Sequence, residues 1–339
     1  MIHKAGQFLL KPVWNYLYLS EGVFRESLNL VIIPTKKCNA NCIFCAYQFL
    51  PNSERINMPD NVFASIISNI KRLGILSVHL TSNSGEPLVA PNLLEKIKEL
   101  RDAGVRTIQL TTNGILLDKI GIDQLLESGP DIINISTTAF DADMYKRLYR
   151  SNQFERMRNN VINLLTENKR RPKPRYITIG IRPDIPKDDV LAMSETQWLI
   201  DHADEVNITE AYGDWLGLIK NSMLLGSMKI EKPSLLSKRP CQVLMTAPAI
   251  HPNGDILACA CRNIHNDPDL YLGNMLETDL GIALRKIQNI AANWHNGKIP
   301  QTCHRCTMYG DPSYYWSGYL RRLIQKMGNH LFHRKIKKQ

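Results

Sequence analysis

The sequence predicts an α/β fold: a partial (β/α)6 barrel of the TIM type, followed by a small C-terminal domain of one β-hairpin and one helix. From residue 28 to residue 212, short apolar runs alternate with stretches of helical spacing, a pattern typical of a parallel sheet covered by helices. The alternation yields six strand–helix units, which are too few for a closed eight-stranded barrel. Beyond residue 240 the alternation gives way to closely spaced cysteines around a predicted hairpin.

Each predicted strand is a short apolar or alternating run. We expect the six barrel strands at 28–33, 77–80, 107–110, 132–136, 176–181 and 205–209. Between them, apolar residues recur at helical spacing. We expect helices over 58–73, 91–103 and 122–126, helical segments up to about residue 167, and a helix over 189–201. Gly104 is placed to end the second helix, because glycine is the commonest residue after a helix C-terminus.

The remaining segments divide the chain into further parts. Residues 1–27 are expected to be an irregular extension and 213–240 a linker. In the C-terminal domain, 241–312, strands over 246–250 and 256–260 should form a hairpin that turns at Asn253-Gly254. A helix over 280–293 and a tight turn at 303–306 follow, and 313–339 is expected to be a basic tail with a final helix from Tyr314.

Charge and hydropathy limit the location and the partners of the chain. Lysine and arginine number 42 against 32 aspartate and glutamate residues, a formal charge of +10. The basic runs at 169–175 and 321–338 are either solvated surface or sites for an anionic partner such as a phosphorylated substrate or a membrane surface. There is no apolar stretch of about 18 residues and no secretory signal pattern. We therefore expect a cytoplasmic protein that could touch a membrane through its tail, with nucleic acid an unexpected partner.

The eight cysteines are clustered, which favours metal binding over disulfides in a chain of this kind. Cys38, Cys42 and Cys45 form the pattern Cys-x-x-x-Cys-x-x-Cys directly after the first predicted strand. Three thiolates can hold three irons of a 4Fe–4S cluster and leave the fourth iron open for a small chelating ligand. The alternative is a zinc site completed by a remote ligand.

This motif resembles that of the radical S-adenosylmethionine (SAM) superfamily, and the resemblance extends over residues 28–306. It implies that the open iron binds SAM, and that Phe44, just before the third cysteine, lies near the adenine. Asn83-Ser84-Gly85-Glu86-Pro87 is similar to the family's Gly-Gly-Glu-Pro segment, which binds the SAM amino group. Because Ser84 replaces the first glycine, that contact would depend on Gly85 and Glu86.

Further pieces of the resemblance follow at later strand ends. Thr112-Asn113-Gly114 is similar to the family's Thr-Asn-Gly. Ser136, with Arg147 or Arg150 downstream, looks like the pair that binds the SAM ribose and carboxylate, and Arg182 lies where the family lines the adenine pocket. The resemblance implies that one electron, from a donor such as flavodoxin or ferredoxin, cleaves SAM. The resulting 5′-deoxyadenosyl radical removes a hydrogen atom from the substrate.

A second group of cysteines resembles the shortened SPASM domain called a twitch domain, in which four cysteines hold an auxiliary 4Fe–4S cluster. These four are Cys241, Cys259, Cys303 and Cys306. A zinc ribbon is the alternative, although it usually has two Cys-x-x-Cys pairs and only one is present. Cys261 remains. It is an incidental thiol, a replacement ligand for Cys259, or a hydrogen-atom donor of the kind found in some twitch-bearing epimerases.

These features predict a radical SAM enzyme that abstracts hydrogen from a small anionic or carbohydrate substrate, sugar- or aminocyclitol-like, giving dehydrogenation or epimerisation. A peptide- or protein-modifying maturase is the second hypothesis, and a zinc-binding nucleic-acid or membrane-surface protein is the third. Acidic and aromatic residues at 210–215 suit a polar ring at the mouth of the barrel, and packing between domains is the other interpretation of Trp215.

Overall fold

The computed structural model describes residues 28–232, 239–260 and 268–310. Within them, one sheet of nine strands runs in the order β11-β10-β9-β1-β2-β3-β4-β5-β6. The six strands from β1 to the edge strand β6 are parallel neighbours, as the sequence predicted. They are β1 (Leu30–Ile32), β2 (Ser77–Leu80), β3 (Thr107–Thr112), β4 (Ile132–Thr137), β5 (Tyr176–Ile181) and β6 (Glu205–Ile208). The sheet is not closed, so the predicted partial barrel is confirmed.

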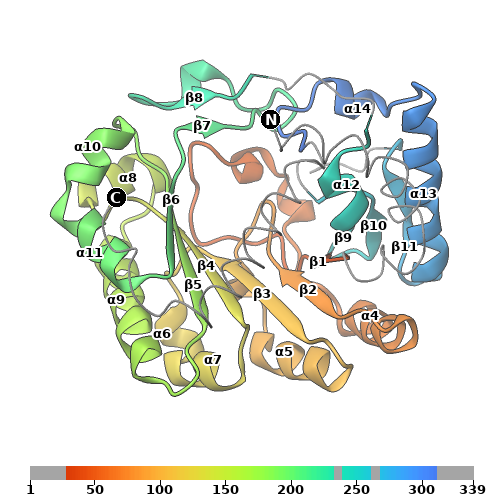
Figure 1. Cartoon of the computed structure of the whole chain (residues 1–339), viewed down its shortest axis with the longest axis horizontal. Helices are drawn as coiled ribbons and strands as arrows, with labels where there is room; N and C mark the ends of the chain where they lie inside the picture. The colour runs from red at the N-terminus through yellow and green to blue at the C-terminus, as the bar shows by residue number, and fades with distance from the viewer. Residues whose placement is uncertain (1–27, 233–238, 261–267, 311–339) are drawn as a thin grey trace, which may run out of the picture.

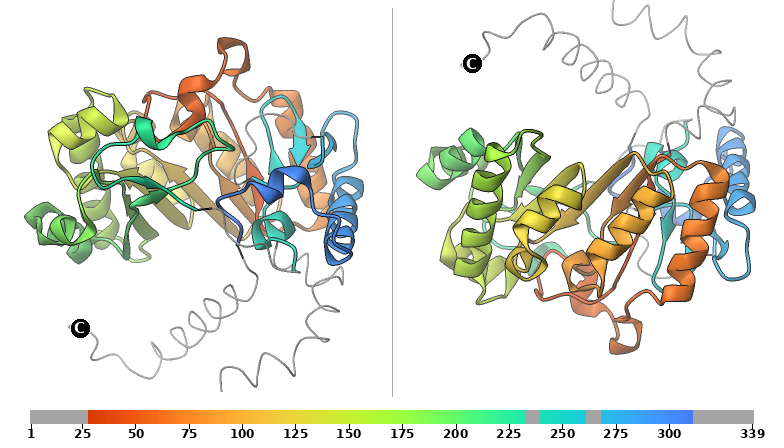
Figure 2. Two further views of the ribbon diagram at one scale, coloured as in Figure 1. Left: turned by 90° about the horizontal axis from the view of Figure 1, so that it is seen from above. Right: turned by 90° about the horizontal axis from the view of Figure 1, so that it is seen from below.

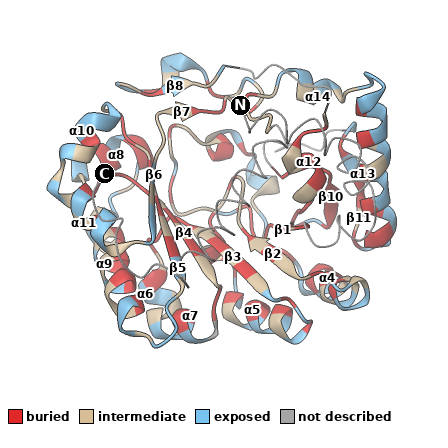
Figure 3. Cartoon of the chain, viewed as in Figure 1, coloured by how far each residue is buried: buried red, intermediate tan, exposed pale blue. Residues whose placement is uncertain are grey.

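Helices cover the convex side of this curved sheet (Figures 1 and 2). They are α4 (Asp60–Leu73), α5 (Leu93–Asp102), α6 (Leu117–Ile120), α7 (Ile122–Ser128), α8 (Ala142–Tyr149), α9 (Phe154–Arg170), α10 (Lys187–Ala192) and α11 (Ser194–His202). Alternate residues of the strands, such as Ile108, Ile133 and Ile177, are fully buried against them in the main hydrophobic core (Figure 3). Burial of this outward face fixes the register of each strand.

The C-terminal elements continue the barrel sheet past β1. They are α12 (Gln242–Thr246), β9 (Ala249–Ile250), β10 (Asp255–Leu257), β11 (Tyr271–Asn274), α13 (Leu280–His295) and α14 (Gln301–His304). Strand β9 pairs parallel to β1 and antiparallel to β10, which confirms the hairpin. Gly254 turns it with φ +90°, a conformation that glycine adopts without strain. The Ser65 hydroxyl of α4 donates to the Met275 carbonyl at 2.8 Å, tying the two parts together.

Two local predictions need correction. The helix expected over 189–201 is broken at Met193, whose backbone is extended, and the Gln197 side chain donates to the carbonyl of Leu191 at the end of α10. Thr246 lies in α12 instead of a strand, because its hydroxyl and the backbone around it bond back to the preceding turn. Within the described part of 213–240, β8 (Lys229–Ile230) pairs with β7 (Ala211–Tyr212), and a 3₁₀ turn, Asn221–Met223, lies between them.

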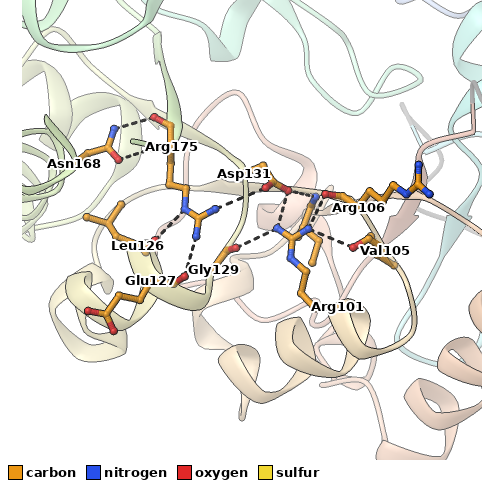
Figure 4. A network of polar contacts seen from close by, with 10 residues as sticks. Arg101, Val105, Arg106, Leu126, Glu127, Gly129, Asp131, Asn168 and Arg175 are labelled. Atoms are coloured by element: carbon orange, nitrogen blue, oxygen red, sulfur yellow. Dashed lines mark hydrogen bonds and ion pairs between the residues drawn. The ribbon is translucent and has the colours of Figure 1, made fainter. Parts of the chain in front are cut away.

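A polar network holds the N-terminal end of the barrel strands (Figure 4). Asp131 accepts the backbone N–H of Ile108 at 2.8 Å and pairs with Arg101 at 2.7 Å and with Arg175 at 3.7 Å. Arg175 also donates to the carbonyls of Leu126 and Glu127, both at 2.9 Å. The network lies away from the C-terminal strand ends, where barrels of this kind place their chemistry.

Some predictions fall outside the described residues. These are the extension 1–27, Cys261, and the basic tail 313–339 with its final helix from Tyr314. The domain boundaries also stay predictions. No helix in the described part of the chain is long and apolar enough to span a membrane.

Candidate active site

The loop with Cys38, Cys42 and Cys45 follows β1 at the C-terminal edge of the sheet, as predicted. Backbone N–H groups of Asn41 and Ile43 donate to the carbonyls of Tyr149 and Leu148 at 3.1 and 2.9 Å, which ties the loop to the end of α8. The Cys45 sulfur accepts the N–H of Tyr47 at 3.4 Å. These hydrogen bonds within the protein therefore fix the conformation of the loop.

The three thiols of this loop influence one another's ionisation. Burial raises the pKa of Cys38 to about 12, with smaller contributions from Glu86 and Cys45. Burial also raises the pKa of Cys42, and Cys45 and Cys38 add to the effect. Three thiolates this close repel one another, so they need bound cations to lose their protons.

Within 28–232, 239–260 and 268–310, no three Cys, His, Asp or Glu side chains are arranged to hold one metal ion. A single zinc ion needs its ligands drawn in to about 2.3 Å from one centre. Thiolates that bind different irons of one cluster lie further apart. Thiolates are the usual ligands of iron–sulfur clusters, so the donor set suits the predicted cluster.

Gly85 and Glu86 lie beside this loop. A Cβ added to Gly85 would lie 2.8 Å from the carbonyl oxygen of Thr35 and 3.1 Å from the Lys36 Cα, so this approach admits only glycine without a shift. The Glu86 backbone N–H donates to the backbone carbonyl of Lys37 at 2.8 Å. The segment from β2 is thus packed directly against the residues that lead into Cys38.

The buried carboxyl group of Glu86 connects this segment to the end of β3. It accepts hydrogen bonds from the Thr112 hydroxyl at 2.6 Å, from the Asn113 N–H at 2.7 Å and from the Leu88 N–H at 3.0 Å. Burial raises its pKa from 4.5 to about 7, and these hydrogen bonds act in the opposite direction. Asn113 in turn donates to Asn39 of the cysteine loop at 2.7 Å. Glu86 and Asn113 therefore join three strand ends.

Ser136 and Arg182 meet at the ends of β4 and β5. Arg182 Nε donates to the Ser136 hydroxyl at 2.9 Å, and the Tyr149 hydroxyl lies 3.1 Å from the same oxygen. The Arg182 guanidinium lies 5.5 Å from the centre of the Phe44 ring, in cation–π range. These two predicted residues are thus placed with Phe44 on one side of the cysteine loop.

Arg147 and Arg150 lie elsewhere. Arg147 Nε donates to Asp184 at 3.0 Å, and Arg150 donates to Gln48 at 3.3 Å. In the described residues neither makes a hydrogen bond to Ser136, whose charged neighbour is Arg182 instead. Arg182 bonds to Ser136 because it directly follows the neighbouring strand β5, and a role of Arg147 or Arg150 in SAM binding stays a prediction.

Three further aromatic residues surround Phe44. Its ring lies edge-on to Tyr149, with centroids 5.4 Å apart, and 5.3 Å from Tyr212. The Trp215 indole N–H donates to the Phe44 carbonyl at 3.0 Å. Trp215 thus packs against the cysteine loop. In the sequence, the only sign of this position is that Trp215 follows the sixth predicted strand.

Three of the C-terminal cysteines, Cys241, Cys303 and Cys306, lie next to the segment 308–310 or to one another. Cys241 is buried and its sulfur accepts the N–H of Gly310 at 3.4 Å, while the Cys306 sulfur accepts the N–H of Met308 at 3.3 Å. The Cys306 N–H donates to the Cys303 carbonyl at 3.2 Å, which forms the predicted tight turn. Backbone N–H groups aimed at sulfur stabilise thiolate ligands.

Comparison with known proteins agrees with this geometry. Residues 32–196 match the family model of the radical SAM superfamily. The chain carries a radical SAM domain. Radical SAM domains use a 4Fe–4S cluster and SAM, and the cysteine loop, Phe44 and Glu86 all lie within the matched residues.

Two curated relatives are similar to parts of this chain. A probable GTP 3′,8-cyclase of Sulfurisphaera tokodaii is 34% identical over 125 residues, which is 37% of this chain and 38% of that protein. A GTP 3′,8-cyclase of Lactiplantibacillus plantarum is 30% identical over 146 residues, 42% of each chain. The matched region thus spans less than half the length of either relative.

Solved structures resemble the fold more broadly. BtrN in complex with AdoMet and 2-DOIA matches with a TM-score of 0.53 and 14% identity, over 82% of this chain and 92% of that one. SuiB of Streptococcus suis bound to the precursor peptide SuiA matches with a TM-score of 0.55 and 19% identity, over 83% and 69%. At this identity the likeness establishes the fold alone.

Proposed function

We propose that this radical SAM enzyme abstracts a hydrogen atom from a small sugar- or aminocyclitol-like molecule and that a second, auxiliary 4Fe–4S cluster accepts the electron released. When bound, the reduced first cluster and SAM supply a 5′-deoxyadenosyl radical that takes hydrogen from a C–H bond. The chain's own residues hold the cysteine loop, orient SAM and shield the site from water. Cys241, Cys259, Cys303 and Cys306 are the proposed auxiliary ligands.

The observation that carries this proposal is contact between the segment 83–87, which packs against the first cysteine loop, and the second cysteine region. The Asn83 side chain, in the segment proposed to bind SAM, donates to the carbonyl of Ala260. Ala260 directly follows Cys259, and its N–H donates to Ala247 beside the start of β9. Because β9 also pairs with β1, the second cysteine region is built onto the same sheet edge as the first. Such proximity suits transfer of an electron from a substrate radical to an auxiliary cluster.

Within the site, Glu86 and Asn113 are proposed to fix the SAM amino-acid end, and Ser136, Arg182 and Phe44 the nucleoside end. Arg147 bonds to Asp184 and Arg150 to Gln48, but each guanidinium keeps further N–H donors, so both stay proposed ligands of the SAM carboxylate. A flavodoxin- or ferredoxin-type donor is the proposed source of the first electron.

A second candidate function is GTP cyclisation, which the curated relatives favour. Anaerobically reconstituted enzyme should be incubated with SAM, reductant and either GTP or an aminocyclitol such as the 2-DOIA bound to BtrN. Stimulated 5′-deoxyadenosine together with aminocyclitol product lacking two hydrogens supports our proposal. A cyclised product from GTP would replace it with the second candidate.

Dehydrogenation and epimerisation are separated by two variants. For an epimerase, Cys261→Ala should still cleave SAM but yield no inverted product, and wild-type product should carry deuterium from solvent. For a dehydrogenase, Cys303→Ala should abolish oxidation while hydrogen abstraction persists. Normal oxidation by Cys303→Ala would remove the auxiliary cluster from the mechanism.

A further inference from the structure

The inner face of the barrel strands is polar, which is unusual for a parallel sheet. Parallel strands are normally apolar on both faces because both are buried. Here the outward positions are buried and apolar, whereas the inward positions of β2 to β5 are half-buried and mostly polar. The central inward positions are His79, Gln109, Thr111, Asn134, Ser136 and Thr178. This face is therefore not packed as a core.

Three of these side chains are joined across β2, β3 and β4. His79 Nε2 lies 2.8 Å from the Thr111 hydroxyl, and Asn134 Nδ2 donates to the same hydroxyl at 3.3 Å. The register places Thr111 directly opposite Asn134. Each side chain is thereby held in one orientation, and the Asn134 carbonyl oxygen and His79 Nδ1 remain for another partner. We call His79, Thr111 and Asn134 the polar ladder.

The ladder carries no charge. Burial lowers the pKa of His79 from 6.5 to about 4, so its ring is neutral at neutral pH. The inward positions along β2, β3, β4 and β5 hold no Lys, Arg, Asp or Glu. Arg182, directly after β5, is bonded to Ser136. A triphosphate would require several cationic donors. Hydroxyl and amide groups of a ligand would find matching neutral donors and acceptors.

An apolar surface borders the ladder. Val31 lies opposite His79 in the sheet register, and it packs with Ile33, Ala249 and Ala260 in a small cluster separate from the main core. A sugar or cyclitol ring has hydroxyl groups at its edge and C–H groups on its faces. The boundary between the polar ladder and Val31 offers surface for both.

The polar ladder lies inside the barrel, below the residues proposed to bind the nucleoside end of SAM. Asn134 precedes Ser136 by two residues on β4, so the ladder is about 7 Å below the Ser136–Arg182 contact. A ring seated on the ladder would therefore lie between that contact and the N-terminal end of the strands.

We propose that His79, Thr111 and Asn134 bind the hydroxyl groups of a neutral sugar or cyclitol ring and so determine the substrate class of this enzyme. This inference rests on the proposed function, of which it specifies the substrate. Thr111 is the central residue, because it orients both of its neighbours.

The test compares Thr111→Val with Thr107→Val in reconstituted, SAM-loaded, unreduced protein. Both changes replace a hydroxyl with a methyl group on the inward face of β3, but Thr107 lies four residues below the ladder residue. Binding of myo-inositol, D-glucose, D-glucosamine and GTP is measured by isothermal titration. Asn134→Leu is a second variant in case Thr111→Val does not fold.

We expect the wild type to bind at least one of the three ring compounds with a millimolar Kd or tighter. Thr111→Val or Asn134→Leu should weaken that binding about tenfold, because ladder groups lose their partner, and Thr107→Val should not. Equal binding by all variants, no binding of any ring compound, or preferential binding of GTP would overturn the inference. SAM cleavage is then measured after the same preparations are reduced: if the wild type and the variants still cleave SAM, a failed binding test removes only the ladder assignment, and if the reduced wild type cleaves no SAM, the proposed function fails.

Discussion

Replacing Glu86 with glutamine should remove a pH dependence of stability that the wild type shows. Burial raises the pKa of this carboxyl from 4.5 to about 7 in the folded protein. Between these values the folded state keeps a proton that the unfolded state has released, so stability is greatest below pH 4.5 and falls as the pH rises to about 7. At about 1.4 kcal/mol per pH unit, the wild type should lose about 3 kcal/mol over this window.

The assay is urea unfolding of anaerobic protein from pH 5 to pH 8, followed by circular dichroism. Wild type, Glu86→Gln and Glu95→Gln are compared, because Glu95 is an exposed carboxylate at the start of α5. Other titrating groups are shared and cancel in the comparison. We expect the stability of Glu86→Gln relative to wild type to rise by about 2–3 kcal/mol over this range, and Glu95→Gln to follow wild type. Parallel curves for all three proteins would refute a raised pKa at Glu86.

Three further predictions concern the loop and the scaffold. Gly85→Ala should destabilise the protein by about 1–3 kcal/mol and weaken SAM binding in calorimetry, because the new methyl group would meet the Thr35 carbonyl at 2.8 Å; unchanged SAM affinity would count against it. Trp215→Phe should leave the folded state intact but release iron to a chelator faster, since the hydrogen bond to Phe44 is lost; an unchanged release rate would contradict this. Asp131→Asn should lower urea stability by about 1–2 kcal/mol without altering SAM affinity, because its ion pairs lie at the opposite end of the barrel.

Much of the barrel could be predicted from local pattern. The strands Ser77–Leu80 and Tyr176–Ile181 were predicted with their observed bounds, because alternating or apolar runs flanked by turns are strong strand signals. The break at Met193 could not be foreseen, because it depends on the Gln197 side chain bonding to Leu191 in three dimensions. The joining of β9 to β1 likewise depends on which sheet edge the folded barrel leaves open.

The site was predictable where a motif is contiguous and unpredictable where it depends on strand register. The Cys38 loop and the segment around Glu86 can be recognised from sequence because each is a short motif at a strand end. The Ser136–Arg182 contact and the polar ladder are not, since each joins single residues from different strands. A lone His79 or Asn134 on an alternating strand is indistinguishable from an ordinary solvent-facing residue until the register is known.

The most direct test of the account is the iron and sulfide content of reconstituted protein, with wild type compared with a Cys38→Ala/Cys42→Ala/Cys45→Ala variant. With two 4Fe–4S clusters, we expect about eight irons per chain in the wild type and about four in the variant. The variant would retain only the cluster on Cys241, Cys259, Cys303 and Cys306. About four irons falling to none, with zinc bound at the C-terminal cysteines, would contradict the auxiliary cluster and the electron transfer proposed for it.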